Sequence, residues 1–234
     1  MQLAAELLGL DLGKAVKSAG FAVREYDHVI AELSSFSVSG MPERAVPKRR
    51  AEFLAGRFAA RQALALLGVD GVPGRNQDGS PRWPEQVVGS ITHGAARALC
   101  AVAQASEVRG IGIDAERLMG EGAKDELLAR ICDVEERALL RRSLASPEQH
   151  LVTFAFSAKE SLYKCLFPQI GRFMDFNAAR VVGALATQSG LGVVGELTLE
   201  LSVDWSEEFR RGRQVRASFL ASGSHVESAV VLLA

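Results

Sequence analysis

The sequence has few cysteines, no excess of either charge and no long apolar run. Its three cysteines, Cys100, Cys132 and Cys165, are odd in number, widely spaced and set in apolar sequence. That pattern is typical of reduced core thiols in a cytoplasm and does not indicate a zinc site. No segment approaches the uninterrupted apolar length needed to span a membrane. The first residues contain Glu6 and Asp11 and lack a basic start, which does not fit a secretory signal. We therefore expect a soluble, cytoplasmic protein.

Charge and composition limit the class of protein further. There are 27 Lys and Arg against 28 Asp and Glu, so net charge favours neither a general nucleic-acid binder nor an acidic tail. No P-loop or glycine-rich nucleotide motif is present. With 234 residues and 48% hydrophobic composition, the chain can form one large domain or two small ones, each with its own core.

Hydrophobic periodicity predicts an α+β fold in which helices pack on mainly antiparallel sheets. The expected strands are 21–29, 87–92, 98–103 and 108–117, followed by four more after residue 178, and the second and third of them form a hairpin. The expected helices lie within 42–68, 123–145 and 148–167. "SITHGAARALCAVA" and "ASGSHVESAVVLLA" resemble each other faintly. This internal sequence similarity predicts two similar α/β halves, 1–110 and 111–234.

Three charged residues interrupt the apolar helix "FAFSAKESLYKCLF" at 154–167. At about 100° per residue the apolar side chains form one stripe, and Glu160 and Lys164 fall outside it, on a face that also carries Ser157 and Ser161. The stripe consists of Leu151, Phe154, Ala155, Ala158, Leu162, Cys165 and Leu166. Taken alone, this pattern also fits a solvated helix face with one surface ion pair.

A second motif, "GIGIDAER", places two carboxylates on one face of a strand. Strand periodicity puts Asp114 and Glu116 on the same side as Gly110 and Gly112, where a ligand could approach the backbone closely. Like charges at this spacing repel, so the pair needs a counter-ion or full exposure to water. With Glu160 these residues supply three hard oxygen donors, which suit Mg²⁺. The alternative is a strand end that runs into a polar turn.

The first half of the chain supplies basic groups that could bind phosphate. Arg50, Arg57 and Arg61 follow one another as a stripe along the helix within 42–68. Arg75 lies in a Gly-rich loop, and Thr92 and His93 follow a strand. A structural hydrogen-bonding role for His93, and a solvated face for the Lys/Arg run at 48–50, are the alternatives.

The order of these motifs is more specific than any one of them. "PKRRAEFLAGRFAAR", "GSPRWP", "GSITHG", "GIGIDAER" and "FAFSAKESLYK" together resemble the surfactin-type (Sfp-type) 4′-phosphopantetheinyl transferases, and especially the enterobactin synthase component D subgroup. The resemblance covers about residues 45–182. Thr92 stands where many members have serine, a change that keeps the hydroxyl group.

The resemblance implies two similar halves with coenzyme A bound in the cleft between them. It also implies Mg²⁺-dependent transfer of the 4′-phosphopantetheine group to a serine of an apo acyl, aryl or peptidyl carrier protein. By similarity, Asp114, Glu116 and Glu160 hold the metal, Glu160 is also the candidate base, and Lys164 contacts the pyrophosphate. The nucleotide side is assigned to 1–110 and the metal and catalytic helix to 111–234. The residues that the resemblance implies for coenzyme binding are Lys48 or Arg49, Arg57, Arg75, Ser80, Thr92, His93, Asp114, Glu160 and Lys164.

The resemblance also leads to an expected partner and to competing functions. The subgroup suggests carriers of siderophore and nonribosomal peptide synthesis, and a two-halved architecture makes a monomer sufficient. An acidic carrier helix could dock near "FPQIGRFMDF", which could instead be a buried loop. The competing functions are another Mg²⁺-dependent nucleotide phosphotransferase and a non-catalytic module that binds carrier proteins.

Overall fold

The computed structural model describes residues 14–234 except 24, 37, 39, 42–44 and 95. The described residues divide into two units, and the chain passes from the first to the second within one strand, between Ile111 and Gly112. The first unit holds the described residues up to Ile111 together with Leu232–Ala234, and the second holds Gly112–Val231. None of the helices described is long and apolar enough to cross a membrane. The sequence expectation for the first residues falls outside the described part.

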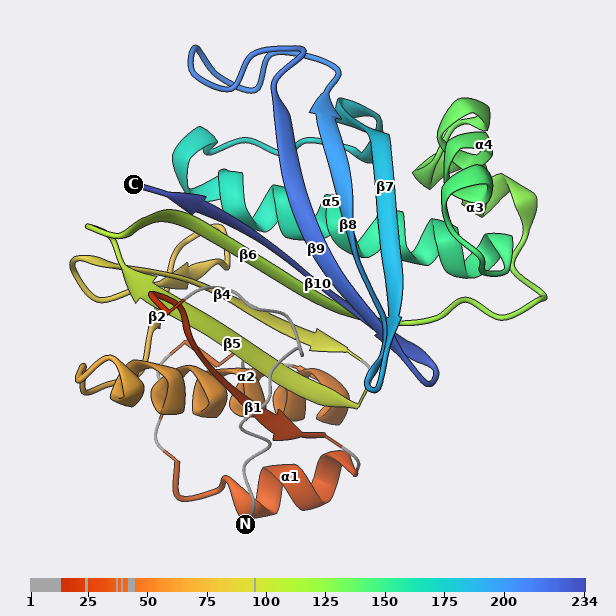
Figure 1. Ribbon diagram of the computed structural model, residues 1–234. Coiled ribbons are helices and arrows are strands. Elements are labelled where there is room, and N and C mark those ends of the chain that lie inside the picture. The colour runs from red at the N-terminus through yellow and green to blue at the C-terminus, as the bar shows by residue number, and fades with distance from the viewer. Residues whose placement is uncertain (1–13, 24, 37, 39, 42–44, 95) are drawn as a thin grey trace. The chain divides into compact units, whose positions relative to one another are not determined.

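In the first unit a long helix packs on a three-stranded antiparallel sheet (Figure 1). The helix α2 begins with Pro47, whose fixed φ suits a first helical position, and Gly68 after its end has φ +75°. The sheet order is β1-β5-β4, and β4 and β5 form the predicted hairpin. The elements are β1 (Lys17–Ala22), α1 (Tyr26–Glu32), α2 (Pro47–Leu66), β2 (Gly74–Arg75), β3 (Pro81–Arg82), β4 (Val87–Gly94) and β5 (Arg97–Gln104).

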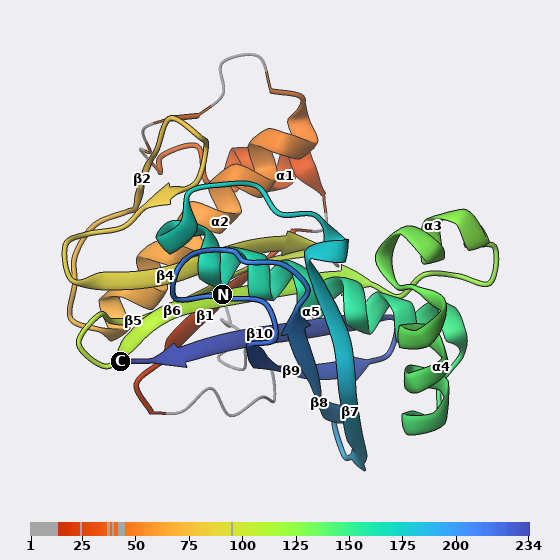
Figure 2. The same cartoon turned by 90° about the horizontal axis from the view of Figure 1, so that it is seen from above.

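The second unit packs the longest helix described, α5, on strands of a five-stranded sheet with the order β6-β10-β9-β8-β7. Figures 1 and 2 both show α5 lying along one face of this sheet. Asp133 starts α4 with a reciprocal capping box, in which the Asp133 side chain accepts from the Glu136 N–H and the Glu136 side chain accepts from the Asp133 N–H. The elements are β6 (Val108–Arg117), α3 (Asp125–Ile131), α4 (Val134–Ser143), α5 (Glu148–Ile170), η1 (Phe176–Ala178), β7 (Ala179–Ser189), β8 (Gly192–Leu201), β9 (Gln214–Ser222) and β10 (His225–Leu233).

The predicted α+β class with mainly antiparallel sheets is confirmed, and two local predictions are wrong. Residues 21–29 are not one strand, because β1 ends at Ala22 and α1 begins at Tyr26. Val29 and Leu33, four residues apart, bury one face of this short helical segment. The helical pattern at 123–145 is two helices, α3 and α4, because the Asp133 capping box starts a new one.

The structure adds to the sequence expectation at three polar segments. Within the basic stripe of α2, Arg57 is buried, whereas Arg50 and Arg61 are exposed. Thr92 and His93 lie inside β4 rather than after it. The apolar stripe of α5 is buried as predicted, but Ser157 and Ser161 are buried as well. Both serine hydroxyls contact the Ser228 hydroxyl at 2.8 Å, which satisfies them away from water.

Candidate functional site

A close approach between β6 and α5 builds the charged site of the second unit. A Cβ atom added to Gly112 would lie 1.8 Å from the Ser161 carbonyl oxygen, so only glycine permits this packing. The predicted opening for a ligand above Gly112 is therefore wrong, because the backbone of α5 occupies that space. The same packing turns Asp114 and Glu116, farther along β6, toward the charged residues of α5.

Asp114 and Lys164 form an ion pair across the two elements. Lys164 Nζ lies 2.6 Å from Asp114 Oδ1 and also donates to the Ile113 carbonyl oxygen at 3.3 Å. The Asp114 side chain is 3% exposed and the Lys164 side chain 27% exposed. A buried carboxylate is thus held by a cation that still reaches water.

Glu116 and Glu160 complete a cluster of like charges. The pKa of Glu116 is raised to about 7, mainly by burial and also by the negative charges of Asp114 and Glu160, against the opposing effect of Lys164. Burial also raises the pKa of Glu160, where Lys164 opposes the shift and Asp114 adds to it. Three carboxylates therefore share one neighbouring lysine, and the ionised forms of Glu116 and Glu160 are disfavoured without a further cation.

This donor set fits a divalent cation in its chemistry, since hard carboxylate oxygens with too little compensating charge favour Mg²⁺. The described residues contain no group of three or more His, Cys, Asp or Glu side chains placed to hold a metal together. Asp114 Oδ1 is held by Lys164 instead. The metal ligands expected from the sequence, Asp114, Glu116 and Glu160, therefore stay a prediction.

In the first unit, basic side chains from α2, β2 and β4 line a pocket of about 130 Å³. Arg57 lies at its inner side, 5% exposed, and donates from Nη2 to the Gly74 carbonyl oxygen at 3.0 Å. Its Nε is buried and makes no hydrogen bond within the described part of the chain. The pKa of Arg57 is lowered to about 10, mainly by burial and also by the nearby Arg75, against the opposing effect of Cys100. The guanidinium therefore stays charged at neutral pH. A buried cation with an unused donor is suited to an anion. The lining residues are Arg49, Glu52, Phe53, Gly56, Arg57, Arg75, Gly79, Pro81, Ile91 and His93.

His93 lies between a cation and a carboxylate in this pocket. Arg49 Nη1 lies 3.0 Å from His93 Nε2, and His93 Nδ1 lies 3.8 Å from Glu52 Oε2. Glu52 was not singled out from the sequence, because a single acidic residue on a basic helix carries no motif. It also pairs with the exposed Lys48 at 3.9 Å.

The structure does not bring every predicted coenzyme contact into this pocket. Arg49, Arg57, Arg75 and His93 line it, whereas Lys48, Ser80 and Thr92 do not. The Ser80 hydroxyl donates to Asp78 Oδ1 at 2.6 Å within the loop, and Thr92 is buried in β4. Of the coenzyme-binding residues that the resemblance implies, these four are supported by lining a common pocket. Their role in binding stays a prediction.

A second cavity, of about 320 Å³, lies beside Glu160 in the second unit. Apart from its charged members it is lined by apolar and aromatic side chains, including Tyr163, Phe173 and Trp205. Phe173 is 76% exposed at its rim, so the segment expected either to dock a carrier or to be buried lies at the surface. The lining residues are Arg130, Lys159, Glu160, Tyr163, Phe173, Met174, Asp175, Phe176, Ala179 and Trp205.

Comparisons with known proteins identify the family. A model of the 4′-phosphopantetheinyl transferase N-terminal domain matches residues 38–103, and a model of the 4′-phosphopantetheinyl transferase superfamily matches residues 110–214. Enterobactin synthase component D of Salmonella typhi is 36% identical over 171 residues, which are 72% of this chain and 70% of that protein. The protein of the same name from Salmonella typhimurium is 42% identical over 144 residues, 62% of this chain and 59% of that protein. The 4′-phosphopantetheinyl transferase PptT of Mycobacterium tuberculosis is 38% identical over 139 residues, 59% of this chain and 60% of that protein.

The chain therefore belongs to the 4′-phosphopantetheinyl transferase superfamily, a family of transferase enzymes. The family predicted from the sequence is confirmed, and so is its likeness to enterobactin synthase component D. Matches to the named relatives span between 59% and 70% of those proteins' own lengths.

Proposed function

We propose that this protein transfers the 4′-phosphopantetheine group of coenzyme A to a serine hydroxyl of an apo carrier protein. The observation that carries the proposal is the cluster of Asp114, Glu116, Glu160 and Lys164, which the packing of β6 on α5 assembles in a member of this family. Phosphoryl transfer needs in-line positioning and neutralised phosphate charge more than covalent chemistry. A carboxylate and an ammonium group one helical turn apart supply a base and a counter-charge on one rigid element.

In the proposed mechanism, Glu160 takes the proton from the acceptor serine hydroxyl while the serine oxygen forms a bond to the β-phosphorus of coenzyme A. The bond from that phosphorus to the bridging oxygen breaks, and adenosine 3′,5′-bisphosphate leaves with the electron pair. A raised pKa suits Glu160 to this task, because a base whose pKa lies nearer the working pH accepts a proton more effectively. Lys164 stabilises the charge that develops on the leaving phosphate, while Asp114 fixes the position of its ammonium group.

A divalent cation fits this mechanism through its charge. Asp114, Glu116 and Glu160 would hold Mg²⁺, which supplies charge neutralisation on the pyrophosphate oxygens when bound. The raised pKa values of Glu116 and Glu160 support this assignment, because a bound cation would favour their ionised forms.

We assign the nucleotide of coenzyme A, with its 3′-phosphate, to the basic pocket of the first unit. Arg57 supports this assignment most directly, since its buried Nε has no acceptor among the residues that the structure describes. Arg49, Arg75 and His93 line the same pocket and supply further donors. The relatives named enterobactin synthase component D suggest carriers of siderophore synthesis as the acceptors. We place the reaction in the cytoplasm, with the monomer as the working form.

A mass measurement tests the proposed function. The protein is incubated with coenzyme A, Mg²⁺ and a panel of apo aryl, peptidyl and acyl carriers, and each carrier is weighed by mass spectrometry. We expect a gain of the phosphopantetheine mass that disappears when the acceptor serine is replaced by alanine. Transfer of a different group would favour another nucleotide phosphotransferase, and carrier binding without any mass gain would favour a non-catalytic binding module.

Arg57→Leu is expected to weaken coenzyme A binding by at least about tenfold, because a charge-assisted contact with a phosphate oxygen is lost. Isothermal titration with coenzyme A and with its form lacking the 3′-phosphate separates the contacts. The variant should bind both forms with similar affinity, whereas the original protein should prefer coenzyme A. Arg61→Leu, on an exposed turn of the same helix, is the matched control. An undiminished preference for coenzyme A in Arg57→Leu would contradict the assignment.

A further inference from the structure

Beside Glu160, Lys159 is a buried cation to which the proposed mechanism gives no role. Its side chain is 3% exposed and forms an ion pair of 2.7 Å with Glu136, whose side chain is equally buried. Replacing such a pair by apolar residues is often neutral for stability, so a buried pair is weak evidence of a stabilising role. The groups that Lys159 binds besides Glu136 are more informative about its role.

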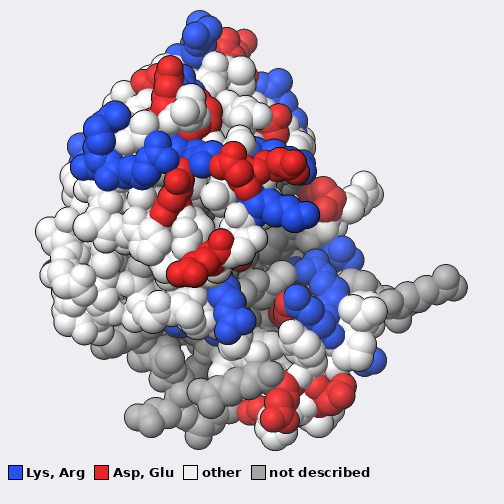
Figure 3. Space-filling model, turned by 90° about the vertical axis from the view of Figure 1, so that its right-hand side faces the viewer, with Lys and Arg blue, Asp and Glu red and all other residues white. Residues whose placement is uncertain are grey.

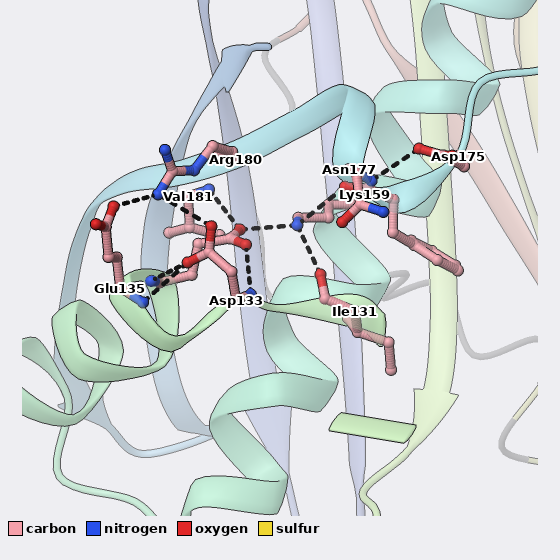
Figure 4. Close-up of polar contacts among 10 residues, drawn as sticks. Ile131, Asp133, Glu135, Lys159, Asp175, Asn177, Arg180 and Val181 are labelled. Atoms are coloured by element: carbon pink, nitrogen blue, oxygen red, sulfur yellow. Dashed lines mark hydrogen bonds and ion pairs between the residues drawn. The ribbon is translucent and has the colours of Figure 1, made fainter. Parts of the chain in front are cut away.

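The three donors of the Lys159 ammonium group have acceptors on three different elements (Figure 4). They are the carbonyl oxygen of Ile131 at 2.7 Å, the carbonyl oxygen of Phe176 at 3.1 Å and Glu136 Oε1 at 2.7 Å. Ile131 is the last residue of α3 and Phe176 the first of η1. A single side chain of α5 thus fastens the end of one helix and the start of another segment.

Glu136 is in turn fixed by two backbone donors. Its Oε1 accepts from the Val181 N–H at 2.8 Å and its Oε2 from the Asp133 N–H at 2.9 Å. In Figure 4 these contacts and those of Lys159 form one connected network that links α4, β7 and α5. Each oxygen of the carboxylate has a partner, so the network is fully paired and has one favoured arrangement.

The segments that Lys159 fastens form a wall of the cavity beside Glu160. Arg130, which precedes Ile131, and Phe176 both line that cavity together with Lys159 and Glu160. Trp205 lines it as well, and its indole N–H donates to the Ala178 carbonyl oxygen at 3.0 Å, at the end of η1. A shift of η1 would therefore move both the cavity wall and this tryptophan.

We propose that Lys159 is a positioning residue: by binding the Ile131 and Phe176 carbonyl oxygens it fixes the cavity wall beside Glu160 and so aligns the reacting groups. This inference rests on the proposed function, in which Glu160 accepts the serine proton. Misplacement of reacting groups by about 1 Å can cost on the order of 10²-fold in rate, so loss of these bonds should reduce turnover without removing any reacting group.

The test compares a single variant with a variant that removes both charges. Lys159→Met leaves Glu136 buried without its cation, and Tm should fall by on the order of 10 °C. Lys159→Met/Glu136→Gln removes both charges, so most of the loss in Tm should be recovered. The carbonyl oxygens of Ile131 and Phe176 still lack their donor in this variant. Turnover measured well below Tm should therefore stay on the order of 10²-fold low in both variants. KM for coenzyme A should change by less than about threefold, because its nucleotide is assigned to the first unit.

Arg137→Met provides a matched control. Arg137 joins the same helices by ion pairs that are partly exposed, to Asp125 at 2.6 Å and to Glu148. Figure 3 shows that Lys and Arg side chains interleave with Asp and Glu side chains on the face with α3 and α4. This variant loses ion pairs but no contact with the cavity wall. Its turnover should stay within about twofold of the original protein.

Trp205 provides a readout that does not depend on catalysis. With Trp83 replaced by Phe, the remaining fluorescence comes from Trp205, since the chain has two tryptophans. We expect a red shift of the emission in Lys159→Met/Glu136→Gln and none in Arg137→Met. If the original protein modifies no carrier, the proposed function fails, while this shift still shows whether Lys159 holds the wall.

Other outcomes would overturn the inference. Recovery of turnover together with Tm in the doubly substituted variant would assign the pair a structural role only. An unchanged Trp205 emission would show that the wall does not depend on Lys159. Should Lys159→Met/Glu136→Gln not fold, Lys159→Leu/Glu136→Leu serves for the same comparison. Failure of both to fold would make the pair a requirement of folding and would equally overturn the positioning role.

Discussion

Glu116→Gln is expected to reduce carrier modification by on the order of 10²-fold or more while the protein stays folded. The substitution keeps the size of the side chain but removes one charge from the set proposed to hold Mg²⁺. Losing one preorganised electrostatic contact in an active site has effects on this scale. Turnover is measured at saturating coenzyme A and carrier over a range of Mg²⁺ concentrations. Glu121→Gln, the same substitution at an exposed loop position, is the control.

The pKa of Glu116 gives this variant an independent signature in stability. The folded-state pKa of about 7 lies above the ordinary value of 4.5, so the folded protein binds more protons than the unfolded chain between these values. Stability should therefore fall as pH rises from about 4.5 to 7, and the loss remains above pH 7. In metal-free buffer, Glu116→Gln should melt higher than the original protein at pH 8 and similarly at pH 4.5. Near-original turnover of the variant in saturating Mg²⁺ would show that Glu116 is not a metal ligand.

Periodicity in the sequence was sufficient to predict the elements that carry the site. The buried stripe of α5 follows a 3.6-residue repeat, and Asp114 and Glu116 share one face of β6 as the two-residue repeat requires. The hairpin of β4 and β5 was predicted from two β runs and the residues between them. Local patterns of this kind depend on neighbours in the chain, which the sequence contains.

Contacts between distant residues were not predictable in the same way. Asp114 and Lys164 are 50 positions apart, and the sequence does not show that they pair. Lys159 interrupts an apolar helix, but its role depends on acceptors contributed by α3, α4 and η1. The capping box from Asp133 to Glu136 was a readable local signal, and it also marks the residue that pairs with Lys159.

The burial of small polar residues was the other source of error. Helical spacing placed Ser157 and Ser161 with the charged residues, yet both lie in the interior against Ser228. Serine hydroxyls can satisfy each other in a small buried group, so polarity alone does not predict exposure. Arg57 is similar, because the Gly74 carbonyl oxygen and the Phe53 ring, 5.0 Å away, accommodate its buried guanidinium.

Glu160 and Lys164 lie one helical turn apart, and we expect their substitutions to separate two tasks. Lys164→Ala should weaken coenzyme A binding and also slow turnover, because a cation near the pyrophosphate attracts charge in both the ground state and the transition state. It also leaves the buried Asp114 carboxylate without its lysine partner, so part of the loss will reflect stability. Thermal melts of Lys164→Ala and Lys164→Gln measure that part.

Glu160→Gln should lower coenzyme A affinity modestly and reduce turnover by on the order of 10²-fold or more, the scale for losing a general base. The amide keeps an oxygen that can coordinate a metal but cannot accept the serine proton. Turnover of the original protein should rise with pH as Glu160 ionises, at a lower pH when Mg²⁺ is bound because the cation favours the ionised form, and the variant should lack this rise. Glu148→Gln on the same helix, whose carboxylate pairs with Arg141 at 2.9 Å, is the control and should keep the original pH profile.

The Mg²⁺ dependence of Glu160→Gln distinguishes the two proposed roles of this residue. A carboxylate that only holds the metal can be compensated by mass action, because a higher Mg²⁺ concentration refills a weakened site. A missing proton acceptor cannot be compensated in this way. We therefore expect that excess Mg²⁺ will not restore turnover at any pH from 6 to 9. Restoration to near the original turnover would make Glu160 a metal ligand only, and the proton would then pass to a bound water molecule or another residue.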